Sequence, residues 1–182
     1  MKNTNHSLFD KYEMIKDLGT GSSGSVTLVR HISMDQERAL KKVPKASAFA
    51  ESALSEARLL KSLEHPSIPR IFDFEEDDAF YYIVEEYIDG ETLDSFLLHQ
   101  QLISPGLFFN ICEQLCNVFI YLHTQISTPI IYRDLKPEHI IVCHNKLKLI
   151  DFGVSAYVIQ DGNNFNHLSL IHISEPTRLR RI

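Results

Sequence analysis

The chain has 182 residues, enough for one large domain or two small lobes that bury a substantial core. Apolar residues make up 44% and charged residues 23%, a globular composition rather than a disordered one. The formal net charge of −6 argues against a nucleic-acid partner held by a broad basic surface.

The cysteine content is low and gives no sign of a metal or disulfide framework. Cys112, Cys116 and Cys143 make an odd number with no Cys-X-X-Cys pair. We interpret Cys112 and Cys116, one turn apart on a predicted helix, as small core residues.

The polar N-terminus lacks the apolar segment of a signal peptide, and no apolar run approaches the length of a membrane span. These features predict a cytoplasmic protein with no membrane contact encoded here.

Short runs of β-branched and aromatic residues dominate the first half of the chain, bounded by Gly, Asp or Pro. The predicted strands are Val26–Arg30, Arg38–Val43, Ile71–Phe74 and Phe80–Glu85. A helix is predicted from Ala46 to Leu63, because apolar residues recur there at three- and four-residue spacing. Asp77-Asp78, within the acidic run Glu75 to Asp78, is interpreted as a hairpin turn between two strands, with a metal site from that run as the alternative.

After Asp89-Gly90 the pattern becomes mainly helical. Thr92 to His99 predicts a short helix, and Ser104-Pro105 supplies an N-cap and a first-turn proline for a long one. The apolar stripe of the long helix is predicted to face the core: Leu107, Ile111, Leu115, Val118 and Leu122. Three extended pieces follow: Ile130–Tyr132, Ile140–Cys143 and Lys146–Ile150. The pattern predicts a mainly β lobe, a linker near Glu86 to Gly90, and a mainly α lobe.

Two features of the first lobe carry chemistry. Gly19, Gly21 and Gly24 lie between two predicted strands, where a hairpin without Cβ atoms lets backbone N–H groups approach phosphate oxygens. A merely flexible hairpin is the alternative. Lys41 lies on an apolar strand, and Glu56 on the predicted helix can supply its acidic partner. A solvated strand lysine is the alternative for Lys41.

The second lobe carries Tyr-Arg-Asp-Leu-Lys-Pro-Glu-His over residues 132–139 and Asp-Phe-Gly over residues 151–153. Asp134 would orient a hydroxyl group and accept its proton, and Lys136 would neutralise charge on a transferring phosphate. Asp151, after an apolar run, could hold a divalent metal ion. Either aspartate alone is more often a turn former.

Taken in this order, the motifs resemble those of the eukaryotic-type protein kinase family, and Asp-Leu-Lys-Pro is similar to its Ser/Thr branch. The resemblance covers roughly Tyr12 to Asn166. It implies an α+β, two-lobe protein-kinase-like fold, with a mainly β N-lobe over 12–89 and a truncated, mainly α C-lobe over 90–167. The implied activity is transfer of the ATP γ-phosphoryl group to a protein Ser/Thr hydroxyl, with Mg²⁺, or alternatively Mn²⁺, as metal cofactor.

The resemblance also implies roles for single residues. The implied catalytic residues are Asp134 as base, Lys136, and Lys41 paired with Glu56. The implied nucleotide-binding residues are Gly19, Gly21 and Gly24 over the phosphates, Lys41 at the α- and β-phosphates, Val26 and Ala39 above the adenine, Ile141 beneath it, and the linker Glu86 to Ile88 at its edge. Asp151 is the implied metal ligand and Glu85 occupies the gatekeeper position. Leu60, Ile71, Tyr132 and Phe152 are implied to form an apolar spine between the lobes.

His139 departs from the family pattern, which has asparagine at this position. An imidazole nitrogen is a poorer ligand for Mg²⁺ than oxygen but suits Mn²⁺ better. The alternative is that His139 only bonds the loop backbone. This departure raises a second function, a pseudokinase that binds ATP without significant transfer. A third, a kinase-fold enzyme acting on a small molecule, is disfavoured because such relatives usually lack this Asp-Leu-Lys-Pro form and this glycine loop.

The last residues do not continue the family pattern. Leu168 to Arg178 resembles a translated transposase adapter of the kind ligated to DNA in sequencing libraries. We therefore interpret 168–182 as a non-native tail and expect the native protein to be longer. A divergent native activation segment is the alternative.

Overall fold

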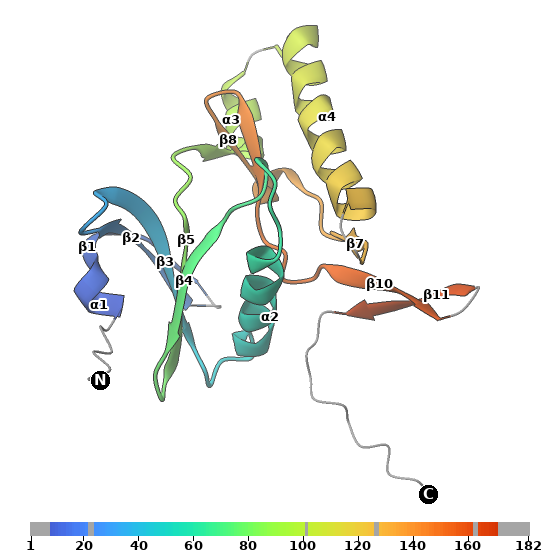
Figure 1. The fold of residues 1–182 in the computed structure, drawn as a ribbon. Coiled ribbons are helices and arrows are strands. Elements are labelled where there is room, and N and C mark those ends of the chain that lie inside the picture. Colours follow the sequence, from blue (N-terminus) through green and yellow to red (C-terminus); the bar gives the residue numbers. More distant parts are fainter. Residues whose placement is uncertain (1–7, 22–23, 101, 126–127, 162–163, 171–182) are drawn as a thin grey trace, which may run out of the picture.

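The computed structural model describes residues 8–21, 24–100, 102–125, 128–161 and 164–170. A five-stranded antiparallel sheet forms the first half, in the order β1-β2-β3-β5-β4 (Figure 1). Its strands are β1 (Tyr12–Gly21), β2 (Gly24–His31), β3 (Gln36–Pro44), β4 (Ile71–Glu76) and β5 (Phe80–Glu86). The four strands predicted from composition are confirmed, each longer than expected. A short helix, α1 (Leu8–Lys11), precedes the sheet, and its Leu8 is fully buried.

The turn between β4 and β5 is built on Asp77. Its Oδ1 atom accepts hydrogen bonds from the N–H groups of Ala79 at 2.8 Å and Phe80 at 2.7 Å. Its Oδ2 atom accepts one from the Tyr82 hydroxyl at 2.8 Å. These bonds, above all the one from Ala79, hold the pKa of Asp77 below its ordinary value. The interpretation of Asp77-Asp78 as a hairpin turn is confirmed, while Glu75 and Glu76 belong to β4.

Helix α2 (Ala50–Lys61) lies beside the sheet and turns its small apolar residues inward. The buried residues of this face include Ala50, Ala53, Ala57 and Leu60. Glu51 in the first turn, and Arg58 and Lys61 in the last, have the charges that a helix dipole favours at each end. The helix is shorter than predicted at both ends. Residues 46–49 form turns in which the Ser47 N–H donates to the Pro44 carbonyl at 3.0 Å, and after Lys61 the N–H groups of Ser62 and Leu63 donate to carbonyls three residues earlier.

The second half combines helices with short strands. Its elements are β6 (Glu91–Thr92), α3 (Leu93–His99), α4 (Pro105–Ile120), the π-helical turn η1 (Tyr121–Gln125), β7 (Ile130–Ile131), the 3₁₀ turn η2 (Pro137–His139), β8 (Ile140–Cys143) and β9 (Lys146–Leu149). Strands β6, β8 and β9 form a small sheet. The predicted cap of α4 is confirmed, since Ser104 Oγ accepts a hydrogen bond from the Leu107 N–H at 3.2 Å.

The main hydrophobic cluster joins α2 to the second half. On the predicted stripe of α4, Val118 and the following Leu122 are buried, and Ile111 and Leu115 pack against the cluster while partly exposed. The four implied spine residues lie in or against this cluster: Leu60, Ile71, Tyr132 and Phe152. The rings of Tyr132 and Phe152 meet edge to face with centroids 5.0 Å apart. The cluster therefore couples the Asp-Phe-Gly segment to α2.

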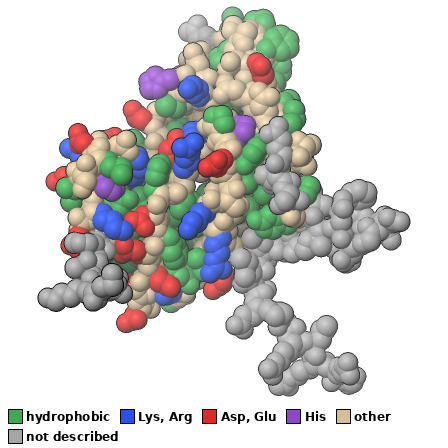
Figure 2. Space-filling model, viewed as in Figure 1, with side chains coloured by type: hydrophobic (Ala, Val, Ile, Leu, Met, Phe, Trp, Pro, Cys, Tyr) green, Lys and Arg blue, Asp and Glu red, His purple; other side chains and the backbone are tan. Residues whose placement is uncertain are grey.

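The outer face of α4 differs from the sequence interpretation of its cysteines. Cys116 is exposed and Cys112 only partly buried, so the prediction that both are core residues is wrong. Phe108, Phe109 and Ile120 on the same helix are also more than half exposed. Figure 2 shows hydrophobic side chains along this edge of the molecule. Within the part of the chain that the structure describes, this face of α4 lacks a packed neighbour.

A hairpin of β10 (Ala156–Asp161) and β11 (Asn164–Leu170) follows the Asp-Phe-Gly segment and pairs with β7. The predicted non-native tail, 168–182, falls mostly outside the described residues. Its first three residues belong to β11. The origin of the tail therefore remains a prediction. None of the described helices is long and apolar enough to cross a membrane.

Leu122 provides a test of the cluster, because it is fully buried within it. We expect Leu122→Ala to lower the free energy of unfolding by about 2–5 kcal/mol, since it leaves a cavity among packed side chains. Urea denaturation measures this value. The matched control is Leu98→Ala, at a side chain that is 83% exposed. Equal losses in the two variants would contradict the assignment of the core.

Candidate active site

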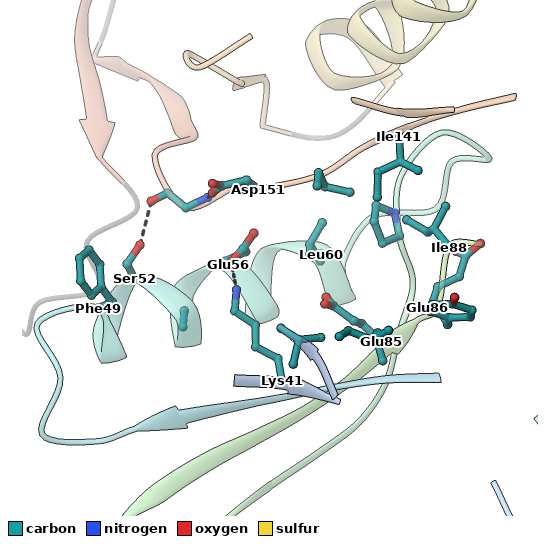
Figure 3. A pocket seen from close by; sticks show the side chains of 18 of the residues that line it. Lys41, Phe49, Ser52, Glu56, Leu60, Glu85, Glu86, Ile88, Ile141 and Asp151 are labelled. Atoms are coloured by element: carbon teal, nitrogen blue, oxygen red, sulfur yellow. Dashed lines mark hydrogen bonds and ion pairs between the residues drawn. The ribbon is translucent and has the colours of Figure 1, made fainter. Parts of the chain in front are cut away.

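A cavity of about 600 Å³ lies where the five-stranded sheet, α2 and the second half meet. Of the residues implied to bind nucleotide, seven line it: Val26, Ala39, Lys41, Glu86, Tyr87, Ile88 and Ile141. Glu56 and Asp151 line it as well. Figure 3 shows Ile141 and Asp151 on one side of the cavity and Lys41 and Glu85 on the other. The structure thus brings together residues that are far apart in the sequence.

The three glycines lie at the hairpin between β1 and β2, as predicted. Gly21 pairs with Gly24 across it. Gly24 has a φ of +136°, and a Cβ atom there would come within 2.1 Å of the Lys42 carbonyl oxygen, so the position requires glycine. The glycines do not line the cavity, although the neighbouring Leu18 does. Because residues 22–23 lie outside the description, the covering of phosphates by this hairpin stays a prediction.

Lys41 and Glu56 form the predicted ion pair. Lys41 Nζ donates to Glu56 Oε2 at 3.0 Å, and the side chains are 22% and 11% exposed. Burial acts to lower the pKa of Lys41, but the nearby carboxylates of Glu56, Glu85 and Asp151 outweigh it, so the pKa lies above its ordinary value. The ammonium group is therefore held charged inside the cavity. The alternative of a solvated strand lysine is wrong.

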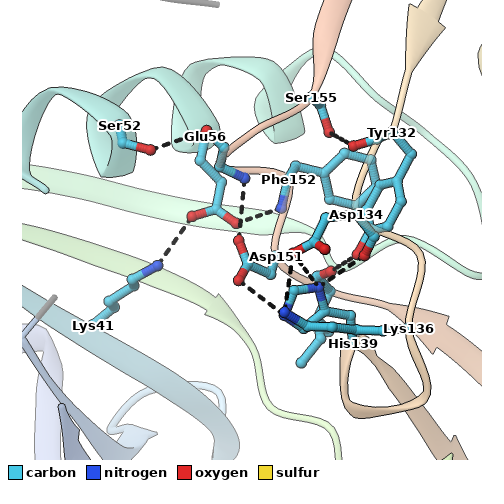
Figure 4. A network of polar contacts seen from close by, with 12 residues as sticks. Lys41, Ser52, Glu56, Tyr132, Asp134, Lys136, His139, Asp151, Phe152 and Ser155 are labelled. Carbon is cyan, nitrogen blue, oxygen red and sulfur yellow. Dashed lines mark hydrogen bonds and ion pairs between the residues drawn. The ribbon is translucent and has the colours of Figure 1, made fainter. Parts of the chain in front are cut away.

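Helix α2 also holds the Asp-Phe-Gly segment by two hydrogen bonds. Glu56 Oε1 accepts from the Phe152 N–H at 2.8 Å, and Ser52 Oγ donates to the Gly153 carbonyl at 3.0 Å (Figure 4). Residues four apart share one face of a helix, so Ser52 and Glu56 reach the same segment. Sequence reasoning missed Ser52. The only signal available was its position one turn before Glu56.

Asp151 stands at the edge of the cavity in an unusual backbone conformation. Its φ is +60°, in the left-handed region that disfavours residues other than glycine. Its Oδ1 atom accepts a hydrogen bond from the Gly153 N–H at 3.2 Å. Its side chain remains 53% exposed, so the carboxylate is accessible from the cavity.

Asp134, Lys136 and His139 lie beside Asp151 rather than in the lining of the cavity. Lys136 Nζ is 3.0 Å from Asp134 Oδ2. His139 lies between the two aspartates, with Nδ1 3.1 Å from the Asp134 carbonyl oxygen and Nε2 3.2 Å from Asp151 Oδ2 (Figure 4). His139 was interpreted either as a residue of the metal site or as one that only bonds the loop backbone. The ring contacts both the loop backbone and the candidate metal ligand Asp151, so each interpretation matches one of its contacts.

The end of β5 is tied to β9 by an ion pair that the sequence did not predict. Lys148 Nζ is 2.7 Å from the Glu86 carboxylate. Around this pair, the Glu86 N–H donates to the Arg70 carbonyl at 2.9 Å, and the Leu149 N–H donates to the Ser67 carbonyl at 2.8 Å. A lysine within a short extended run gave no sign of a partner some sixty residues away.

The comparisons with known proteins agree with this geometry. Residues 12–171 match the protein kinase domain family. The chain is 31% identical over 179 residues to serine/threonine-protein kinase PrkC of Bacillus subtilis. The matched region covers 93% of this chain and 27% of that protein. It is 34% identical over 172 residues to calcium-dependent protein kinase 4 of Plasmodium falciparum, covering 86% and 31% respectively.

A third relative is cAMP-dependent protein kinase type 3 of Saccharomyces cerevisiae, 35% identical over 158 residues, with 84% of this chain and 39% of that protein covered. The chain thus spans between 27% and 39% of the length of these three relatives. The family match extends from the first strand of the sheet through the Asp-Phe-Gly segment. The chain therefore belongs to the eukaryotic-type Ser/Thr protein kinase family.

Proposed function

We propose that this chain binds ATP and transfers its γ-phosphoryl group to a serine or threonine hydroxyl of a protein substrate. The observation that carries the proposal is the double contact of Glu56. One carboxylate oxygen fixes Lys41 and the other fixes the backbone next to Asp151, so a buried cation and an accessible carboxylate face the same cavity. A polyphosphate with a metal counter-ion needs these two charges.

In the proposed reaction the substrate hydroxyl oxygen attacks the γ-phosphorus while the bond to the β,γ-bridging oxygen breaks, and ADP leaves. Asp134 orients the hydroxyl group and accepts its proton, and Lys136, 3.0 Å from Asp134, faces the transferred phosphoryl group. Lys41 holds the α- and β-phosphates. Catalysis rests on positioning and charge neutralisation rather than on a covalent enzyme intermediate.

The residues present fit a divalent metal ion. The Asp134 carbonyl oxygen can only accept a hydrogen bond, so the 3.1 Å contact places a proton on His139 Nδ1, and Nε2 faces Asp151 and can act as a metal ligand when it carries no proton. Nε2 and Asp151 Oδ2 are 3.2 Å apart, close to the spacing of adjacent ligands on one ion. We assign Asp151 and His139 as the protein ligands. The bound ion would neutralise phosphate charge, and the mixed oxygen and nitrogen donors suit Mn²⁺ as well as Mg²⁺.

The second candidate is a pseudokinase, and the same contact favours it. If the His139 ring instead carries a proton on Nε2 and keeps donating it to Asp151 when nucleotide binds, this carboxylate is not available to a metal ion and transfer fails while ATP still binds. We place either protein in the cytoplasm. Cys112, Cys116 and Cys143 are free thiols, which suits a reducing compartment that also supplies ATP.

Lys41→Met tests the phosphate contact. We expect ATP-dependent transfer to fall by about 100-fold or more, because the variant removes the buried cation. The measurement is γ-phosphate transfer to a generic protein substrate. The control is Lys42→Met on the same strand, whose ammonium group lies 4.0 Å from the Phe80 ring rather than in the cavity. Unchanged turnover in Lys41→Met would overturn its assignment.

Ser52→Ala tests the hold of α2 on the Asp-Phe-Gly segment. We expect kcat to fall by about two- to tenfold, the equivalent of one lost hydrogen bond, with KM for ATP little changed. Ser52→Thr should restore the rate. Ser62→Ala is the matched control, because its hydroxyl donates to the Leu59 carbonyl on the same helix, away from the cavity. A change in the KM for ATP with kcat unchanged would refute a positioning role for Ser52.

His139→Asn separates the two candidate functions. We expect it to raise Mg²⁺-dependent transfer and to lower the ratio of Mn²⁺- to Mg²⁺-dependent rates, because an amide oxygen replaces imidazole nitrogen. Transfer rates with each metal in both proteins give the answer. ATP binding without transfer in both proteins would favour the pseudokinase, and an identical metal ratio would remove His139 from the metal site.

A further inference from the structure

Glu85 places a carboxyl group at the inner end of the cavity. It lies opposite Ala39 in the pairing of β3 with β5, and opposite Ile71 in the pairing of β4 with β5. Directly paired residues of antiparallel strands share a face of the sheet, so the Glu85 side chain stands beside Ala39 on the cavity side. Figure 3 shows the Glu85 carboxyl group directed into the cavity between Lys41 and Leu60.

This carboxyl group has no polar partner among the described residues. Lys41 acts on it electrostatically, but the Lys41 ammonium group forms its hydrogen bond and ion pair with Glu56 instead. The neighbours directly across the strands, Ala39 and Ile71, are apolar. A partly buried carboxyl group that faces a cavity without a partner loses hydration at a free-energy cost unless a ligand supplies the missing hydrogen bond.

The position of Glu85 indicates which part of a nucleotide would supply the missing hydrogen bond. Lys41, the proposed phosphate contact, lies two residues beyond Ala39 on the same strand, and Glu86 to Ile88 line the cavity directly after Glu85. A purine held between Ala39 and Ile141 with its edge along that linker would present one edge to Glu85. A carboxylate can only accept hydrogen bonds, so it favours an amino group at that edge and opposes a carbonyl oxygen.

We propose that Glu85 determines the base specificity of the site by selecting a 6-aminopurine nucleotide over a 6-oxopurine nucleotide. This inference rests on the proposed function, since it assumes that a purine nucleotide occupies the cavity. It adds a specificity-determining residue that acts on the base rather than on the phosphates.

Protonation makes the selectivity depend on pH. Burial raises the pKa of Glu85 to about 7, the Lys41 ammonium opposes this shift, and the Glu56 carboxylate reinforces it. The Asp151 carboxylate also contributes to this group of charges, because it helps to raise the pKa of Lys41. Above pH 7 the ionised group only accepts hydrogen bonds. Below pH 7 the protonated group can also donate one to a 6-oxo oxygen, so discrimination should weaken as the pH falls.

The experiment is calorimetric titration of the purified protein with ATP and with ITP, which differ in the group at the purine six-position. Wild type, Glu85→Leu and Glu85→Gln are measured at pH 6 and pH 8, with Glu76→Gln, an exposed position at the far end of β4, as control. Both nucleotides carry the same triphosphate, so its titration cancels in the affinity ratio. A thermal melt confirms that each variant is folded.

For wild type and Glu76→Gln, we expect the ratio of ATP affinity to ITP affinity to be roughly tenfold higher at pH 8 than at pH 6. This factor corresponds to the discrimination of one good hydrogen bond. Glu85→Leu should lose this pH dependence and part of the preference. Glu85→Gln, whose amide both donates and accepts, should show a small preference that does not vary with pH. It keeps the test valid if the leucine variant does not fold.

Two failures are distinguishable. If wild type binds neither nucleotide, the proposed function itself is wrong and the inference falls with it. If wild type binds ATP but its ATP-to-ITP ratio is independent of pH, or unchanged in both Glu85 variants, the role of Glu85 is refuted while the proposed function stands.

Discussion

The carboxylate of Glu56 is the constraint on which the arrangement of the site depends. A single side chain on α2 bonds the ammonium group of a strand and the backbone of a segment near the end of the described chain. A change in the position of α2 would break both contacts at once. The geometry of the candidate site is therefore a property of where one helix packs, and the small buried residues Ala53 and Ala57 let that helix approach the sheet closely.

Much of this arrangement followed from local sequence patterns. Strands rich in β-branched residues, the Ser104 cap and the turn at Asp77 are each determined by neighbours within a few positions, so they could be predicted. The Lys41 and Glu56 pair followed from the need of a buried cation for an acid, and from a helix placed next to its strand. The resemblance to a family supplied the roles that spacing alone left open.

The remaining features depend on contacts that no local pattern records. The bond from Ser52 to Gly153 and the pair of Lys148 with Glu86 join residues that only the folded chain brings together. The exposure of Cys116 reflects the absence of a described neighbour on the outer face of α4, which helical periodicity does not report. The position of His139 between two aspartates likewise depends on how the loop folds back on Asp151.

The pair of Lys148 with Glu86 has a mechanical consequence. Lys148 is the residue paired with Ile141 across β8 and β9, so the proposed floor of the base site is joined through one ion pair to the linker that forms its edge. The pair thus ties the first sheet to the second half at the linker end of the cavity, so the separation of floor and edge is set in the folded chain before a ligand binds. If a base occupies this slot as proposed, the floor and edge that contact it are preorganised, and its binding orders few groups of the protein.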